Sequence, residues 1–229
     1  MKRVCQYEQG DDSKTAQSGN ITLEFPLVGE MNFFGICVLT LWLYLPGFLA
    51  NTFAMLWGKW LPKTGYGPWP IDGGRTLSDG NRILGDGKTW SGLLGGTLGG
   101  VAFGLLLDAG DSRMALERLT GEEYEQSLWG DSSILVFFLL SFGALFGDMT
   151  ASFYKRRQNL QRGDKFALLD MYDFIFMSLL LCFIFQRDWL LSWILDGWVP
   201  LFTILVLTPF LHRGVNIIGY KIGVKNEPW

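Results

Sequence analysis

Residues 33–57, FFGICVLTLWLYLPGFLANTFAMLW, decide the fold, because this stretch contains no charged side chain. A helix crosses the hydrocarbon core of a bilayer with about 20 consecutive, mostly apolar residues. The proline at position 46 is compatible with such a helix, since neighbouring groups can satisfy the freed backbone. We therefore expect an integral membrane protein.

Four further runs of this kind are expected to cross the membrane, at about residues 90–107, 134–151, 168–185 and 189–211. Apolar residues make up 49% of the chain and aromatic residues 15%. The mean hydropathy of +0.22 is modest because long polar loops separate the runs. The sequence therefore predicts an all-α, polytopic membrane protein with five transmembrane helices.

Residues 1–30 differ from the rest of the chain. They are polar, carry Asp11, Asp12 and Lys14, and show no sustained periodicity. They also lack the apolar core of a cleavable signal peptide. We expect a flexible N-terminal extension, with Met31 as an alternative start, followed by a single membrane domain over residues 31–229.

Basic residues fall on one side of the expected membrane. Lys and Arg are concentrated in segments 58–89 and 152–168 and in the C-terminal tail, whereas segment 108–131 is acidic. Short segments rich in Lys and Arg stay in the cytoplasm. The loops at 58–89 and 152–168 are therefore predicted to be cytoplasmic, with the N-terminus outside and the C-terminus inside.

The second run carries a row of glycines at steps of four, at positions 92, 96, 100 and 104. Such a row lies along one face of a helix and lets another backbone come close. We interpret it as a packing face, which indicates a compact bundle and not a ligand site.

Alternating helices bring the end of the first, the start of the second, the end of the third and the start of the fourth to one face of the membrane. Polar residues gather at all four places, and in the third and fourth helices their spacings of three and four put them on shared faces. The residues are Asn51, Gly85, Asp86, Gly87, Lys88, Thr89, Asp148, Ser152, Lys155, Arg156, Arg157, Asp170 and Asp173.

This gathering of charges predicts a functional site, because ionisable residues at membrane depth are costly. Carboxylates suit Mg²⁺, which prefers oxygen ligands, and clustered cations neutralise phosphoryl charge. A polyphosphate handled at the inner membrane surface would need both. Two simpler interpretations stay open: the run KRR at 155–157 could be an inside anchor, and Asp170 could cap a helix.

Several nucleotide and metal motifs are excluded. The GKT at 87–89 resembles the end of a P-loop, but the glycine required five residues earlier is Arg82. His212 is the only histidine, which excludes histidine metal clusters. No pair of nucleophile and base for covalent catalysis is found.

Three motifs together resemble those of a known family. The first cytoplasmic loop contains PIDGGR at 70–75, DGNR at 79–82 and LGDGKTWSG at 84–92. The second motif is GDMTASFYKRR at 147–157, and the third is LDMYDF at 169–174. The set, in this order from about residue 31 to the C-terminus, looks like CDP-archaeol synthases, relatives of the CDP-diacylglycerol synthases.

The resemblance implies a membrane cytidylyltransferase that joins CTP and digeranylgeranylglyceryl phosphate to give CDP-archaeol and pyrophosphate, with Mg²⁺. It implies a multi-pass cell-membrane protein whose site faces the cytoplasm, with CTP, a lipid phosphate and the bilayer as partners and no nucleic acid. By this resemblance Asp148 and Asp170 bind Mg²⁺ with Asp173 as a further ligand, Lys88, Lys155 and Arg156 hold phosphates, the amides of residues 85–89 hold the triphosphate, and Asn51 and Asp72 contact the nucleotide.

Two other functions remain open at this point. A CDP-diacylglycerol synthase acting on ester lipids would carry similar motifs, because many residues can form an apolar groove for lipid chains. A small transporter would more typically show an internal repeat and helices broken at the midplane. A CDP-alcohol phosphotransferase would need a DGxxAR run followed by paired aspartates, which is absent.

Overall fold

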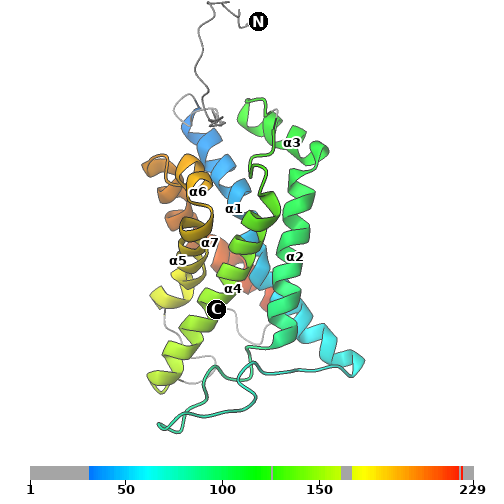
Figure 1. Cartoon of the computed structure of the whole chain (residues 1–229), viewed down its shortest axis with the longest axis vertical. Helices are drawn as coiled ribbons and strands as arrows, with labels where there is room; N and C mark the ends of the chain where they lie inside the picture. The colour runs from blue at the N-terminus through cyan, green and yellow to red at the C-terminus, as the bar shows by residue number, and fades with distance from the viewer. Residues whose placement is uncertain (1–30, 125, 161–166, 222, 224–229) are drawn as a thin grey trace, which may run out of the picture.

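The computed structural model describes residues 31–124, 126–160, 167–221 and 223, apart from the side chains of residues 111 and 167–169. The predicted extension, residues 1–30, lies outside the described residues. Every regular element within them is a helix, which confirms the all-α prediction (Figure 1). The elements are α1 (Phe33–Trp60), the 3₁₀ helix η2 (Leu61–Thr64), α2 (Trp90–Asp108), α3 (Gly110–Thr120), α4 (Ser133–Arg157), α5 (Ala167–Phe185), α6 (Arg187–Trp193) and α7 (Trp198–Lys221).

Four helices in the described part of the chain are long and apolar enough to cross a bilayer: α1 with η2, α2, α4 and α7. They support a multi-pass membrane protein. The expected fourth span forms as α5, but α5 is not among these four.

The last expected span, 189–211, is wrong in its boundaries. The chain forms two helices there, α6 ending at Trp193 and α7 beginning at Trp198 and continuing to Lys221. Asp196 and Gly197 lie in the break, and both are poor helix formers. Pro200 falls in the first turn of α7, where backbone N–H groups have no partner inside the helix.

Three segments expected to be loops contain helix. Residues 58–64 of the expected loop 58–89 form the end of α1 and η2. α4 continues through the basic run to Arg157, so residues 152–157 of the expected loop 152–168 are helical. In the acidic segment, α3 is amphipathic and buries Leu116 completely. Gly121, at a φ of 79° that favours glycine, ends α3, and the following residues pack Tyr124 and Trp129 into the core. The acidic segment is therefore a folded cap.

The glycine row of α2 packs against α1 and α4, as the spacing predicted. A Cβ added at Gly96 would lie 2.8 Å from the carbonyl oxygen of Ala50 on α1. A Cβ at Gly100 would meet Ser141 of α4, and one at Gly104 would meet the ring of Phe137. Only glycine permits these approaches.

α4 and α5 are in contact along their lengths. Gly143 meets the backbone of Ser178, and Gly147 meets the backbone of Asp173. Tyr44 of α1 crosses to this pair, since its hydroxyl lies in hydrogen-bond contact with Ser178. Figure 1 shows the result: α3 and α6 lie at one end of the bundle, and residues 65–89 with the end of α4 lie at the other, here called the loop end.

Candidate active site

The loop of residues 65–89 is organised around one buried carboxylate, Asp72, whose side chain is fully enclosed. Asp72 accepts five hydrogen bonds. Two come from the guanidinium of Arg82, at 2.6 and 3.2 Å. The others come from the backbone amides of Gly74, Leu84 and Gly85, at 2.9 to 3.1 Å. The side chain of Asp72 thereby connects the part of the loop around Gly74 with the part around residues 82–85.

The charge on Asp72 is strongly favoured. Burial acts to raise the pKa of this carboxyl, but the hydrogen bonds from Arg82 and from the amides of Gly85, Leu84 and Gly74 outweigh burial and hold the pKa well below its ordinary value. The charge on Arg82 is favoured as well, since its hydrogen bonds to Asp72 and Asp86 raise the pKa of the guanidinium. The pair stays ionised at any physiological pH.

The loop leads directly into α2. The backbone amide of Ile71 donates to the carbonyl of Lys88 at 2.8 Å, and that of Trp90 donates to the carbonyl of Trp69 at 2.9 Å. The hydroxyl of Thr89 then caps α2 by accepting from the amide of Gly92 at 3.0 Å. The GDGKT stretch is thus held at the first turn of α2, as the sequence predicted.

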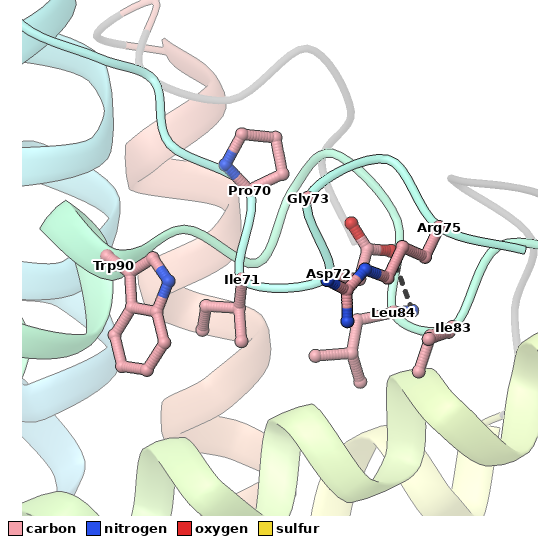
Figure 2. Close-up of a pocket in the computed structure, with 8 residues that line it drawn as sticks. All are labelled: Pro70, Ile71, Asp72, Gly73, Arg75, Ile83, Leu84 and Trp90. Carbon is pink, nitrogen blue, oxygen red and sulfur yellow. Dashed lines mark hydrogen bonds between the residues drawn. The ribbon is translucent and has the colours of Figure 1, made fainter.

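A hollow of about 460 Å³ lies in this loop (Figure 2). Its wall is mixed: Ile71, Ile83, Leu84 and the half-exposed Trp90 are apolar, and Asp72 and Arg75 are charged. The charged pairs described next do not line it.

Two lysine–aspartate pairs join the loop, α4 and α5. Lys88 of the loop forms an ion pair with Asp148 of α4. About two turns further along α4, Lys155 lies 2.8 Å from Asp170 at the start of α5. Asp173 interacts electrostatically with Asp148, Asp170 and Lys88. The structure therefore brings together five of the predicted site residues from three separate segments.

The close approach of α4 and α5 explains this convergence. Gly147 has no side chain, so the backbone of Asp173 lies where a Cβ would otherwise stand. Asp148, the next residue along, is thereby held beside the start of α5. In the motif GD at 147–148, the glycine allows the close helix packing and the aspartate supplies the carboxylate that pairs with Lys88.

Arg156 and Arg157 have different surroundings although they are neighbours. Arg156 reaches the carbonyl of Leu160, and a Cβ at Gly85 would lie 3.7 Å from its Nε. That Nε is buried without a hydrogen-bond partner among the described residues. Arg157 instead binds the loop through Asp79, at 2.7 Å. The Nε of Arg157 is likewise buried without a hydrogen-bond partner among the described residues. Arg156 differs in that its Nε lies beside Gly85 of the loop.

The other predicted site residues are not part of the lysine–aspartate pairs. Ser152 is buried on α4 between Asp148 and Lys155, as its spacing implied. Asn51 is half-buried on α1. Of the amides expected to cradle a triphosphate, that of Gly85 donates to Asp72 and that of Lys88 to the carbonyl of Gly85. These two amides are already used within the loop.

No three His, Cys, Asp or Glu side chains of the described residues gather closely enough to form a ready metal site. Asp148, Asp170 and Asp173 nevertheless offer oxygen donors, the type that Mg²⁺ prefers. Two of these carboxylates face lysines.

Sequence reasoning missed the roles of Asp79 and Arg82. Both belong to the DGNR run at 79–82, in which the sequence alone assigns no role to an individual residue. The turn signal of Asp followed by Gly was visible. Their partners, Arg157 and Asp72, lie far away in sequence or across the loop, so no local pattern reveals the pairing.

Comparison with known proteins identifies a family that this chain matches. Residues 33–229 match the family model described as CarS-like: CDP-archaeol synthase. A CDP-archaeol synthase of Archaeoglobus fulgidus is 39% identical over 196 residues, covering 83% of this chain and 96% of that protein. One of Picrophilus torridus is 41% identical over 190 residues, covering 83% and 95%.

A solved structure is also similar. It is described as an intramembrane enzyme for archaeal membrane lipids biosynthesis. The two chains share 32% sequence identity with a TM-score of 0.51, over 77% of this chain and 92% of the other.

Proposed function

The chain belongs to the CDP-archaeol synthase family, and we propose that the charged cluster at the loop end is where it performs the family's reaction. It is a membrane cytidylyltransferase that forms CDP-archaeol. The substrates that we assign to it are CTP and an ether-lipid phosphate, digeranylgeranylglyceryl phosphate, and the second product is pyrophosphate.

One observation carries the proposal: ion pairs from three segments converge at one end of the bundle. Lys88 faces Asp148, and Lys155 faces Asp170. The side chains of these four residues are between 15% and 40% exposed, so solutes can reach them. A purely structural ion pair would gain little from such partial exposure. A polyphosphate substrate, in contrast, needs cations that are held in place but accessible.

The reaction requires no general base in this proposal. An oxygen of the lipid phosphate is already anionic, and it attacks the α-phosphorus of CTP. A new P–O bond forms to the lipid, the bond between the α-phosphorus and the bridging oxygen breaks, and pyrophosphate leaves. The protein contributes positioning and charge neutralisation, as in other phosphoryl transfers.

The cations are assigned to phosphate groups. Lys88 and Lys155 turn from their carboxylates toward the triphosphate or the lipid phosphate. Arg156 uses its buried Nε, which has no partner among the described residues. Ser152 and Thr89 are assigned as neutral contacts beside these cations, and Asn51 as a contact to the nucleotide.

The carboxylates are assigned to Mg²⁺, with Asp148 and Asp170 as ligands and Asp173 as a further ligand. The electrostatic interaction of Asp173 with both of the others supports this grouping. A bound Mg²⁺ would offset phosphate charge during the transfer. Until then Lys88 and Lys155 neutralise Asp148 and Asp170.

We further propose five spans, with α5 crossing the membrane in addition to α1, α2, α4 and α7, and a loop end that faces the cytoplasm. The α5 helix lies between the basic end of α4 and the short α6, so counting it as a span keeps the alternation regular. Lys59, Lys63, Arg75 and the run 155–157 all lie toward the loop end. Positive residues of short loops stay inside.

The test is a transfer assay with purified protein in lipid–detergent micelles. Radiolabelled CTP is offered with digeranylgeranylglyceryl phosphate and, in parallel, with phosphatidic acid. We expect a labelled lipid product with the ether lipid, and its loss when excess EDTA removes Mg²⁺. A product from phosphatidic acid alone would instead assign the chain to ester lipids, and no product from either would reject the proposed reaction.

A further inference from the structure

Arg157, the last residue of α4, makes three contacts with the loop of residues 65–89. Its guanidinium lies 2.7 Å from the carboxylate of Asp79. It also donates to the carbonyl of Arg82 at 2.6 Å and to that of Asn81 at 3.4 Å. A single side chain of a membrane helix therefore holds one turn of the loop.

The side chains of Arg157 and Asp79 are each held in position by a further contact. The guanidinium of Arg157 lies over the ring of Phe153, with 5.3 Å to the ring centroid. The carboxylate of Asp79 accepts the amide of Asn81 at 3.0 Å, which sets the turn. A second link lies alongside, since the side-chain amide of Asn81 donates to Asn159 at 2.6 Å.

This contact is connected to the charged cluster through Arg82. The carbonyl of Arg82 receives Arg157, while its guanidinium binds Asp72 and Asp86. Asp86 precedes Lys88, the partner of Asp148, by two residues. The loop is thus attached to α4 at two points, one at Asp148 and one at Arg157.

We infer that Arg157 and Asp79 are positioning residues, which hold the loop against the end of α4 and so place Lys88 and its neighbours for the triphosphate of CTP. The inference rests on the proposed function. It assigns Arg157, one of the polar residues predicted to form the site, to the loop and not to the substrate, because Nη1 and Nη2 of its guanidinium contact three loop acceptors. Asp79 touches no substrate in this arrangement and acts only through the loop.

Asp79→Asn is the sharpest probe. Asparagine keeps the oxygen that accepts the amide of Asn81 and removes the charge that binds Arg157. The KM for CTP should rise about threefold to fivefold, the range for a partly exposed ion pair, and kcat should stay within about twofold. Trypsin cleavage after the exposed Arg75 should be faster than in the wild type by at least the same factor. The melting temperature in detergent should not change.

Two variants complete the experiment. Arg157→Lys keeps the charge opposite Asp79 but loses the fork that reaches the two carbonyls, so its KM should lie between those of the wild type and Arg157→Ala. Asp196→Asn makes the same chemical change at an exposed position in the break before α7 and should alter neither KM nor cleavage.

Trypsin cleavage can be measured without turnover of CTP. The proposed function and the positioning role of Arg157 and Asp79 can therefore be rejected independently. Wild-type protein without CTP turnover would reject the proposed function. Unchanged cleavage after Arg75 and unchanged KM in Asp79→Asn would reject the positioning role. A fall in kcat together with a lower melting temperature would also reject it, because that result describes a general structural defect.

Discussion

Two aspartates at the loop end show how surroundings decide what a carboxylate does. The side chain of Asp72 is fully enclosed and accepts five protein hydrogen bonds. The side chain of Asp148 is 40% exposed and faces one lysine. The resemblance gave both residues a role toward substrate. The contacts favour Asp148 for chemistry and Asp72 for holding the loop.

Asp148→Asn tests the chemical role. Asparagine keeps the shape and removes the charge that Mg²⁺ or Lys88 would meet. We expect turnover of CTP to fall about a hundredfold or more, on the order of 3 kcal/mol of transition-state stabilisation. Mg²⁺ titrations of CTP turnover provide the measurement. Asp170→Asn should behave alike, and the double variant should be hardly worse than either, because both act through one site.

Melting curves in detergent serve as the control for this prediction. The melting temperature should change little in Asp148→Asn, since the carboxylate is partly exposed. Near-normal turnover combined with a large loss of stability would mean that Asp148 is structural.

Asp72→Asn tests the organising role. An amide group in place of one oxygen would face the amides of Leu84 and Gly85 and lose a charge-assisted bond, which typically costs about 1.5–3 kcal/mol. Hydrogen exchange at Leu84 and Gly85 should therefore accelerate at least tenfold. Exchange at the core residue Leu140 should stay unchanged. Equal exchange in variant and wild type at pH 7 would show that Asp72 does not order the loop.

The pH dependence of this effect follows from the lowered pKa of Asp72. Because the folded-state pKa lies below the ordinary value of 3.8, the ionised carboxyl stabilises the loop fully above that value and loses the effect as pH falls below it. Exchange protection in the wild type should thus be independent of protonation of Asp72 between pH 5 and pH 8.

At the level of the elements, the α2 glycine row was predictable because packing leaves a periodic mark in the sequence. Gly96, Gly100 and Gly104 each face a neighbouring helix at a distance that excludes a side chain. A spacing of four residues is visible without any knowledge of the partner.

Gly96→Ala tests this packing. The added Cβ would lie 2.8 Å from the Ala50 carbonyl, the Ala54 Cβ and the Leu145 side chain, so backbone must shift. We expect a loss of about 1–3 kcal/mol, as for other overpacked cores, measured as reduced resistance to thermal unfolding in detergent. Gly214→Ala is the matched control, because Gly214 lies inside α7 with nothing within 4 Å of an added Cβ. It should be neutral or slightly stabilising. Equal melting temperatures for both variants would contradict close packing at Gly96.

The element boundaries and the long-range pairs could not be read from the sequence in the same way. Apolarity alone predicts that α4 ends near residue 151, because the basic run that continues the helix to Arg157 resembles a loop. The break between α6 and α7 was missed because apolar residues continue on both sides of Asp196. The pairing of Arg157 with Asp79 depends on how a loop folds back, for which the sequence holds no period.

The whole molecule has two chemically distinct ends. At one end lies the loop of residues 65–89 with the end of α4, and at the other lie α3 and α6 (Figure 1). The first end carries the lysine–aspartate pairs, and the second carries the acidic segment that caps the bundle. Such an asymmetry suits a membrane enzyme that draws a water-soluble nucleotide from one side only.

The orientation that we propose for this asymmetric molecule can be tested in intact cells. We predict that a cysteine replacing Lys63, exposed at the loop end, is shielded from an impermeant thiol reagent, because basic segments stay in the cytoplasm. A cysteine replacing Glu123, exposed in the acidic cap, should be labelled. The background must lack Cys5, Cys37 and Cys182, so that only the introduced thiol reacts. Permeabilised cells are the control, and there both cysteines should react. Labelling at Lys63 with protection at Glu123 in intact cells would reverse the orientation and put the charged cluster on the side without CTP, in which case the proposed reaction could not take place there.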